Sequence, residues 1–214
     1  MPDPGLSSLR YMDSSWTSSC RAFADAAEWF VSTAALVGDQ WSRPGLGEWD
    51  VRSLVGHTSR SFLTVETYLS RPAETVEVDS SAGYFRATRT LAAGPEVAAR
   101  GRAAGDALGP DPAPAVREIA ARVLPLVVDR DGTELVTTIV GGMRLRDYLP
   151  TRTFELVVHT ADLATALDLP FEVPATPAAQ VLDLVAQLAV AEGVAGPLLL
   201  GATGRGLPAG FSVL

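Results

Sequence analysis

Apolar side chains recur along this chain at the three- and four-residue spacing of an α-helix. Residues 13–37 follow this pattern, and residues 51–69 follow it directly after Asp50, whose carboxylate suits a helix N-cap. Further helices are predicted over residues 81–108, 115–128, 147–168 and 177–192. The dipeptide Gly94-Pro95 interrupts the first of these four helices, which makes its prediction weaker. Several amphipathic helices joined by short connectors are typical of an antiparallel helix bundle.

Two stretches are expected to be extended instead of helical. Residues 134–145 alternate and contain several β-branched side chains, and Gly141-Gly142 suits a turn, so they indicate a short hairpin or an extended loop. Near the end, residues 198–201 and 211–214 flank Gly204-Arg205-Gly206, which suggests two short strands around a turn.

The predicted fold is therefore mainly α. Residues 1–195 are expected to form the helix bundle that carries the functional site, and residues 196–214 a short C-terminal β element packed on the bundle. The chain has 214 residues, of which 47% are hydrophobic and 20% are charged. This length and composition are sufficient to bury a full core and argue against disorder.

The charged residues and the single cysteine narrow the classes of function. The net charge is -8, so we expect no nucleic-acid partner and no anionic membrane surface as a partner. All 17 basic residues are arginine, which excludes a lysine Schiff base or a lysine general base. Cys20 has no second cysteine to pair with. Met1–Gly5 do not resemble a secretory signal, and no apolar run reaches the roughly 18 residues that span a membrane, so a cytoplasmic protein is expected.

The chain has only two histidines, His57 and His159. Glu155, His159 and Asp162 lie at positions i, i+4 and i+7 of a predicted helix, on one face. Most neighbouring positions are apolar, so this polar stripe is expected to face the interior, where a carboxylate needs a partner or a metal. If His57 reaches the same place from its own helix, the three ligands with one open position suit a catalytic divalent metal.

The same residues also allow a structural interpretation. His159 could form hydrogen bonds within the core while Glu155 pairs with Arg152, and a lone histidine such as His57 could be structural or lie on the surface. Asp162 could orient a ligand histidine or pair with an arginine. Arg152, one turn before Glu155, could contact this candidate ligand or lie on the surface of the bundle. Spacing alone does not separate these alternatives.

Two segments carry a resemblance to a known family. Residues 41–57, which end in GEWDVRSLVGH, and residues 152–164, RTFELVVHTADLA, together resemble the mycothiol-dependent maleylpyruvate isomerase family, part of the DinB-like superfamily. The two segments stand in the family's order and at about its separation, and the resemblance covers residues 13–169. It implies a DinB-like four-helix bundle.

The resemblance also implies a chemistry. In the family, the positions of His57, Glu155 and His159 are ligands of a divalent metal, for which Zn²⁺ is expected, although Ni²⁺, Co²⁺ or Fe²⁺ also fit such a donor set. The metal activates mycothiol or a similar low-molecular-weight thiol, and the thiolate attacks a small electrophile. Addition followed by elimination gives an isomerase, and retention of the adduct gives an S-transferase.

One departure from the family pattern concerns the substrate. Full-length isomerases of this type have a C-terminal α/β domain that contributes an arginine to the substrate's carboxylates, whereas the tail of this sequence offers only Arg205. Specific maleylpyruvate isomerisation is therefore not expected. Arg152, Asp162 and Arg205 are candidate contacts for the metal ligands or the substrate, and Arg205 is otherwise a surface turn residue.

Two other functions stay open at this point. One is a non-catalytic bundle with a structural metal or a ligand-binding role, and the other is a metal-independent enzyme of specialised metabolism. A homodimer is one assembly that the sequence allows.

Overall fold

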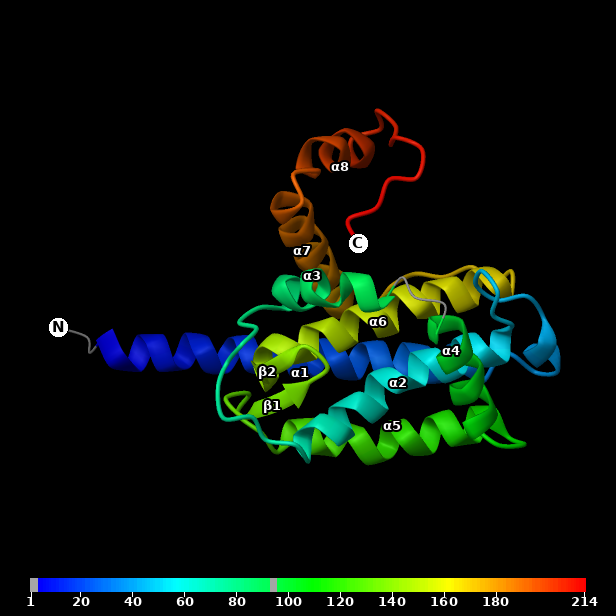
Figure 1. Ribbon diagram of the computed structural model, residues 1–214, viewed down its shortest axis with the longest axis horizontal. Helices are drawn as coiled ribbons and strands as arrows, with labels where there is room; N and C mark the ends of the chain where they lie inside the picture. Colours follow the sequence, from blue (N-terminus) through cyan, green and yellow to red (C-terminus); the bar gives the residue numbers. More distant parts are fainter. Residues whose placement is uncertain (1–3, 93–95) are drawn as a thin grey trace.

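The computed structural model describes residues 4–92 and 96–214, and the side chains of residues 15–89 and 96–214. The long helices are α1 (Pro4–Ala34), α2 (Val51–Leu69), α5 (Pro112–Val128), α6 (Leu145–Ala166) and α7 (Ala175–Ala191). The shorter elements are η1 (Gln40–Ser42), α3 (Ser81–Ala92), α4 (Glu96–Ala107), β1 (Leu135–Thr138), β2 (Gly141–Arg144) and α8 (Ala195–Ala202). A mainly α fold with a small β element is confirmed (Figure 1).

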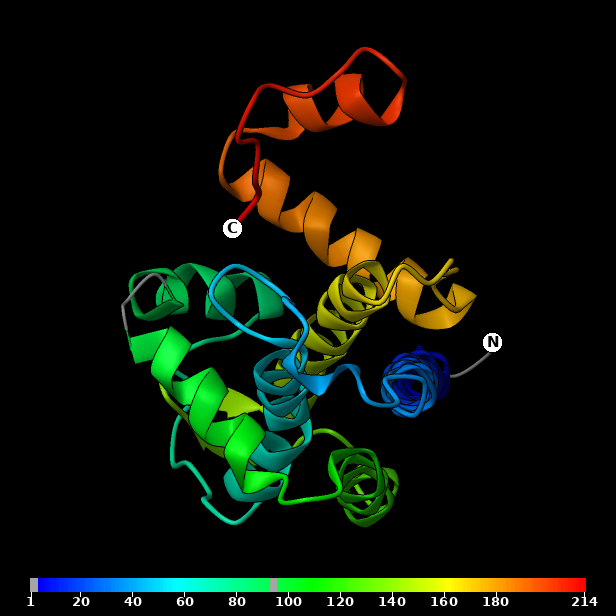
Figure 2. The ribbon, with the colours of Figure 1, turned by 90° about the vertical axis from the view of Figure 1, so that its right-hand side faces the viewer.

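Four helices form the bundle. Helix α1 packs against α5 and α6, and α2 packs against the same two helices, so that the four surround one core (Figure 2). Fully buried side chains fill this core, among them Phe23 and Phe30 of α1, Phe62 of α2 and Leu156 of α6. The remaining helices cover the bundle from outside: α4 lies on α2, and α3 and α7 lie on α6. The predicted bundle is therefore the architecture observed.

Helix α2 begins where the sequence predicts. The carboxylate of Asp50 accepts a hydrogen bond from the backbone N–H of Ser53 at 2.8 Å, which satisfies one of the free donors of the first turn. Helix α4 then packs on α2 at very short range, because Gly56 of α2 faces the backbone of Gly105. A Cβ atom added at Gly56 would lie 2.2 Å from the Gly105 nitrogen, so this contact requires glycine.

Helix α6 lies at the centre of the fold. It follows β2 without a linker and packs against α1, α2, α3 and α7. Its buried residues therefore lie on several sides, as expected for a helix that is apolar nearly all round. The helix ends at Ala166, and Asp168 just beyond it adopts a positive φ of 54°.

The hairpin predicted over residues 134–145 is present, but its turn is not at the two glycines. Strands β1 and β2 pair antiparallel with Thr138 opposite Gly141, which leaves Ile139 and Val140 as the turn. Gly142 lies within β2, where a Cβ atom would come 2.0 Å from the Thr75 carbonyl oxygen. The loop between α2 and α3 also donates the Glu77 N–H to the Gly142 carbonyl at 2.9 Å. The glycine is needed for this close approach and not for the turn.

The two strands predicted in the C-terminal tail are wrong. Residues 195–202 form helix α8, and no strand is assigned anywhere in residues 196–214. The run Leu198–Leu200 is too short for periodicity to distinguish a strand from a helix. The β element of the fold is the internal hairpin, not a C-terminal one.

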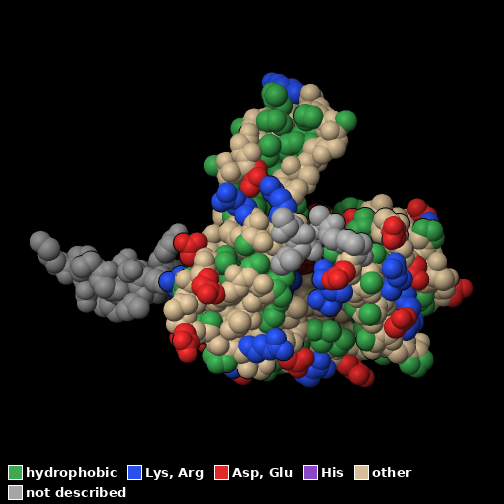
Figure 3. Space-filling view, viewed as in Figure 1, with side chains coloured by type: hydrophobic (Ala, Val, Ile, Leu, Met, Phe, Trp, Pro, Cys, Tyr) green, Lys and Arg blue, Asp and Glu red, His purple; other side chains and the backbone are tan. Residues whose placement is uncertain are grey.

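Helices α7 and α8 form an arm that rises from the bundle (Figures 1 and 2). Hydrophobic side chains gather on its surface (Figure 3), and the exposed ones include Leu182, Val190, Leu199 and Leu200. Arg86 and Arg89 of α3 both bind Glu192 at the end of α7, which ties the arm to the bundle. None of the described helices combines the length and the apolar character that crossing a membrane requires.

Two helix boundaries differ from the expected ones. The predicted helix over residues 81–108 is divided into α3 and α4, and the residues Gly94-Pro95 that suggested an interruption lie outside the described part of the chain. Helix α1 begins at Pro4, earlier than the expected start near residue 13. Neither difference alters the bundle.

Candidate metal centre

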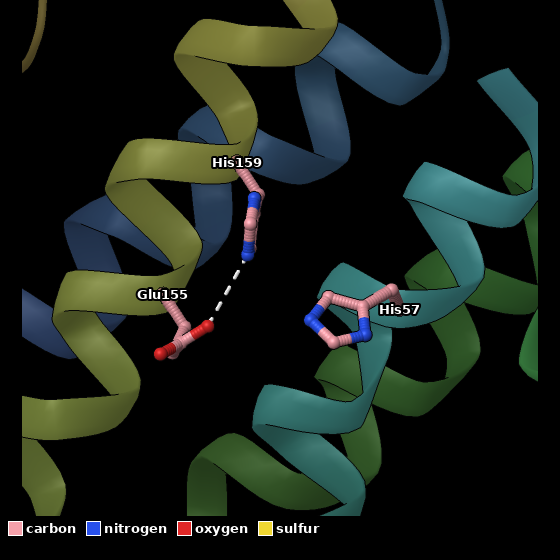
Figure 4. A group of neighbouring side chains, drawn as sticks. All are labelled: His57, Glu155 and His159. Carbon is pink, nitrogen blue, oxygen red and sulfur yellow. Dashed lines mark ion pairs between the residues drawn. The ribbon is translucent and has the colours of Figure 1, made fainter. Parts of the chain in front are cut away.

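Two neighbouring helices bring both histidines and a glutamate together. His57 lies in the second turn of α2, and Glu155 and His159 lie one turn apart on α6 (Figure 4). A ring nitrogen of His57 is directed toward the gap where Glu155 and His159 meet (Figure 4). One ligand atom from each residue lies within 4.8 Å of the other two. Within the described residues this is the single group with such an arrangement.

The distances suit a small divalent cation. A metal of the size of zinc holds nitrogen and oxygen ligands at about 2.0–2.2 Å, which separates two ligands of a tetrahedral site by about 3.4 Å. The distance from His159 Nε2 to Glu155 Oε2 is 3.2 Å, close to that value. Closing the remaining gap to His57 requires a movement of at most about 1.5 Å. Two imidazoles and one carboxylate therefore fit such a metal in both chemistry and spacing.

The site is recessed without being closed. The side chain of His159 is 15% exposed and that of Glu155 is 22% exposed. A small molecule can therefore reach the two residues from solvent, while most of their surface is covered by neighbouring helices.

Asp162 orients His159 from the far side of its ring. The Asp162 carboxylate lies 3.0 Å from Nδ1 of His159, which leaves Nε2 directed at Glu155. Burial alone would lower the pKa of His159, but the hydrogen bonds to Asp162 and Glu155 raise it to about 9. Asp162 thus contacts His159, and among the described residues it forms no ion pair with an arginine. A carboxylate behind a histidine ligand is common in metal sites.

His57 is held in a different environment. Burial, with a smaller contribution from His159, lowers its pKa to about 4, so the ring is neutral at neutral pH and has a lone pair to donate. The indole of Trp49 stacks on the ring with centroids 4.4 Å apart, and its Nε1 donates to the Ala98 carbonyl of α4. Nδ1 of His57 is buried and has no hydrogen-bond partner among the described residues. The ring is therefore contacted by a tilted indole, at an interplanar angle of 34°, and its Nδ1 has no hydrogen bond within the described residues.

Glu155 is ionised in spite of its surroundings. Burial raises the pKa of this carboxyl, but the hydrogen bond from His159 and the positive charge of Arg152 outweigh burial and lower the pKa to about 2. Arg152 therefore lies close enough to act on Glu155 electrostatically, although the two side chains form no ion pair within the described structure.

The structure corrects one alternative for Arg152 and leaves Arg205 away from the site. Arg152 is not on the bundle surface, since it is only 8% exposed and its guanidinium lies over the rings of Tyr84 and Tyr148. Arg205 is exposed beyond α8 and bonds to Thr203. The aromatic surroundings of Arg152 and the stacking of Trp49 on His57 were not predicted, because both depend on contacts between separate helices.

Cys20 is not a candidate nucleophile. It is partly buried on α1, packs against the core, and its pKa is raised by burial to about 11. The ordinary value is 9.0, so the reactive thiolate is roughly a hundredfold scarcer than for an unperturbed thiol.

We therefore expect iodoacetamide to alkylate Cys20 slowly in the native protein at pH 7.5. The rate should be roughly a hundredfold below that of the same protein in denaturant, because unfolding removes both the burial and the raised pKa. Mass spectrometry of timed samples gives both rates. Equal rates would mean that Cys20 is accessible and ionised in the folded state.

Comparison with known families matches residues 19–164 to the model of the mycothiol maleylpyruvate isomerase N-terminal domain. The matched segment includes all of α2 and most of α6, and with them His57, Glu155, His159 and Asp162. Helices α7 and α8 lie beyond it. Neither the curated proteins nor the solved structures gave a match.

Proposed function

This chain belongs to the family of the mycothiol maleylpyruvate isomerase N-terminal domain, and from this membership we propose that it is a metal-dependent enzyme that joins a small thiol to a small electrophile. The observation that carries the proposal is the meeting of His57, Glu155 and His159 within 4.8 Å between α2 and α6. Zn²⁺ is the metal that we propose, because three such ligands with an open position suit it.

The residues around the site have separate tasks in this proposal. His57, Glu155 and His159 hold the metal, which when bound lowers the pKa of a thiol and keeps the thiolate beside an electrophile. Asp162 keeps the His159 ring in the orientation that directs Nε2 toward Glu155. Trp49 limits rotation of His57 by stacking on it. Binding then requires only that His57 and the Glu155–His159 pair approach each other by the distance given above.

The attacking sulfur must come from a separate molecule. Cys20 is the only cysteine, and its raised pKa makes it a poor nucleophile. We propose mycothiol or a similar low-molecular-weight thiol as co-substrate. The reaction forms a bond between sulfur and an electrophilic carbon, and the thiol proton goes to the other carbon of an activated double bond. In a transfer the adduct is the product; in an isomerisation the thiol leaves again after rotation about the former double bond.

The test combines metal content with thiol dependence. Protein purified without a histidine tag should contain about one divalent metal per chain and should form conjugates from mycothiol and activated alkenes. Changing Glu155→Gln should lower the rate roughly a hundredfold or more, because a neutral amide is a poor ligand in place of a carboxylate. Elemental analysis and mass spectrometry of the conjugate give the two readouts.

Glu66→Gln is the matched control, since Glu66 is a carboxylate that pairs with Arg122 on the surface of the bundle. It should keep the metal and the rate of the parent protein. Protein that takes up no metal after reconstitution would overturn the proposal. A chelator that lowers the melting temperature of a protein with no thiol-dependent activity would indicate the structural role instead.

A further inference from the structure

Arg152 belongs to the same stripe of α6 as the candidate metal ligands. Tyr148, Arg152, Glu155 and His159 follow one another at intervals of four, three and four residues, which places them on one face of the helix. Arg152 therefore lies about one turn from Glu155, on the side of the helix N-terminus. The axial rise between the two residues is roughly 4.5 Å.

Aromatic rings hold the Arg152 side chain. Its Cζ lies 5.2 Å from the ring centre of Tyr84 on α3 and 5.0 Å from that of Tyr148 on α6. The Tyr148 hydroxyl donates to Thr64 Oγ1 at 2.9 Å, which fixes this ring against α2. Cation–π contacts of this kind stabilise a guanidinium that has lost most of its water. They use the faces of the rings and leave the N–H groups of the arginine free to bind an acceptor.

Most of the hydrogen-bonding capacity of Arg152 is unused. Nε donates to Thr151 Oγ1 at 3.0 Å, and the two terminal nitrogens have no acceptor within the described part of the chain. In the described part of the chain, two polar side-chain atoms are fully buried and have no hydrogen-bond partner: Nδ1 of His57 and Oε1 of Gln180. The terminal nitrogens of Arg152 are not among them. They therefore retain access to solvent, although Arg152 as a whole is only 8% exposed.

The paired surface arginines provide a contrast. Arg122 donates through Nε and Nη2 to both carboxylate oxygens of Glu66. Arg152 has the same planar set of donors about one helical turn from Glu155, with no protein carboxylate bound to it in the described structure. A carboxylate that approached this guanidinium would meet a fixed cation whose two terminal nitrogens carry four free N–H groups.

We propose that Arg152 binds a carboxylate group of a reactant, about one helical turn from the metal ligands. A guanidinium pairs with both oxygens of a carboxylate in one plane, and the pairing is stronger where water is largely excluded. The carboxylate can belong to the electrophile or to the thiol. The placement of this group beside the reacting sulfur rests on the proposed function, whereas the binding of a carboxylate at Arg152 does not.

Calorimetric titration with propionate and with the neutral propionamide tests the binding directly. The parent protein should bind propionate roughly tenfold or more tightly than propionamide, and Arg152→Gln should remove the difference. Arg152→Lys keeps the charge, loses the planar fork, and should bind propionate more weakly than the parent. Arg122→Gln, which alters a surface arginine, should bind both probes as the parent does.

His159→Ala separates this site from the metal site. If the Arg152 guanidinium is the group that binds the carboxylate, this variant should still prefer propionate, even though it lacks a metal ligand. Loss of the preference in His159→Ala with retention in Arg152→Gln would mean that the metal binds the carboxylate, and would overturn the proposal. Equal binding of both probes by the parent would also overturn it. If Arg152→Gln does not fold, Arg152→Lys replaces it in the test. Propionate binding by Arg152→Lys as tight as by the parent would then contradict the proposal.

Kinetics then identify which reactant carries the group. If the electrophile carries the carboxylate, Arg152→Lys should raise KM for that electrophile in a thiol-dependent assay and leave KM for its amide unchanged. If the thiol carries the carboxylate, the variant should raise KM for that thiol and leave KM for its amide unchanged. An absence of any thiol-dependent reaction with propionate binding intact would contradict the proposed function alone.

Discussion

Replacing His159 with alanine is expected to leave a folded bundle that no longer retains a divalent metal. His159 is one of only three candidate protein ligands, and its Nε2 lies 3.2 Å from the carboxylate of Glu155. Two remaining ligands on separate helices hold a metal poorly, so we expect its affinity to fall by roughly two orders of magnitude or more. Elemental analysis after dialysis measures the retained metal, and circular dichroism shows whether the helices remain.

Graded variants test whether the loss follows the geometry. His57→Ala should have the same effect as His159→Ala. Asp162→Ala should keep the site but weaken metal binding roughly 10–100-fold, because it removes the carboxylate that orients His159 and no ligand. Metal bound by the His159→Ala variant as tightly as by the parent would contradict the assignment of this residue as a ligand.

Replacing Gly56 with alanine is expected to destabilise the protein and to disturb the site through the backbone. The added Cβ would lie 2.2 Å from Gly105 N and 2.4 Å from the Ala104 carbonyl carbon, and neither backbone atom can move independently of α4. Such overpacking costs roughly 1–3 kcal/mol, which corresponds to about 2–12 °C in melting temperature for a chain of this size. Because His57 is the next residue, metal affinity should fall as well.

The matched control for Gly56→Ala is Gly196→Ala. Gly196 lies in α8, and a Cβ atom there would have nothing within 4 Å. This change should be neutral or should stabilise α8 by up to about 1 kcal/mol, because alanine favours a helix more than glycine does. Thermal unfolding of the two variants provides the comparison. A Gly56→Ala variant as stable as the parent would show that α2 and α4 can separate without cost.

The sequence predicted those elements whose signals are local. The start of α2 follows from Asp50 as an N-cap, and the burial of α6 follows from its apolar composition. The tail was predicted wrongly because Leu198–Leu200 is a short apolar run, and α8 forms although Leu199 and Leu200 are exposed. The place of the hairpin turn was missed because the need for glycine at Gly142 arises from a loop that is distant in sequence.

The site shows the same division between local and distant information. The helical spacing of Glu155, His159 and Asp162 was sufficient to place the three side chains on one face. Spacing left open whether His57 reaches them, and the family resemblance implied that it does. The rings that surround Arg152 come from α3 and α6, and no pattern within either segment predicts that they meet.

The separation of His57 from Glu155 and His159 along the chain has a consequence for folding. An ion held between α2 and α6 would act as a reversible cross-link that closes a loop of about a hundred residues, comparable in topology to a long-range disulfide. Such a link restricts the unfolded ensemble only while the ligands remain deprotonated and together. Competition for the ion by a chelator would then act on the global unfolding equilibrium, and not only on the few side chains that contact it.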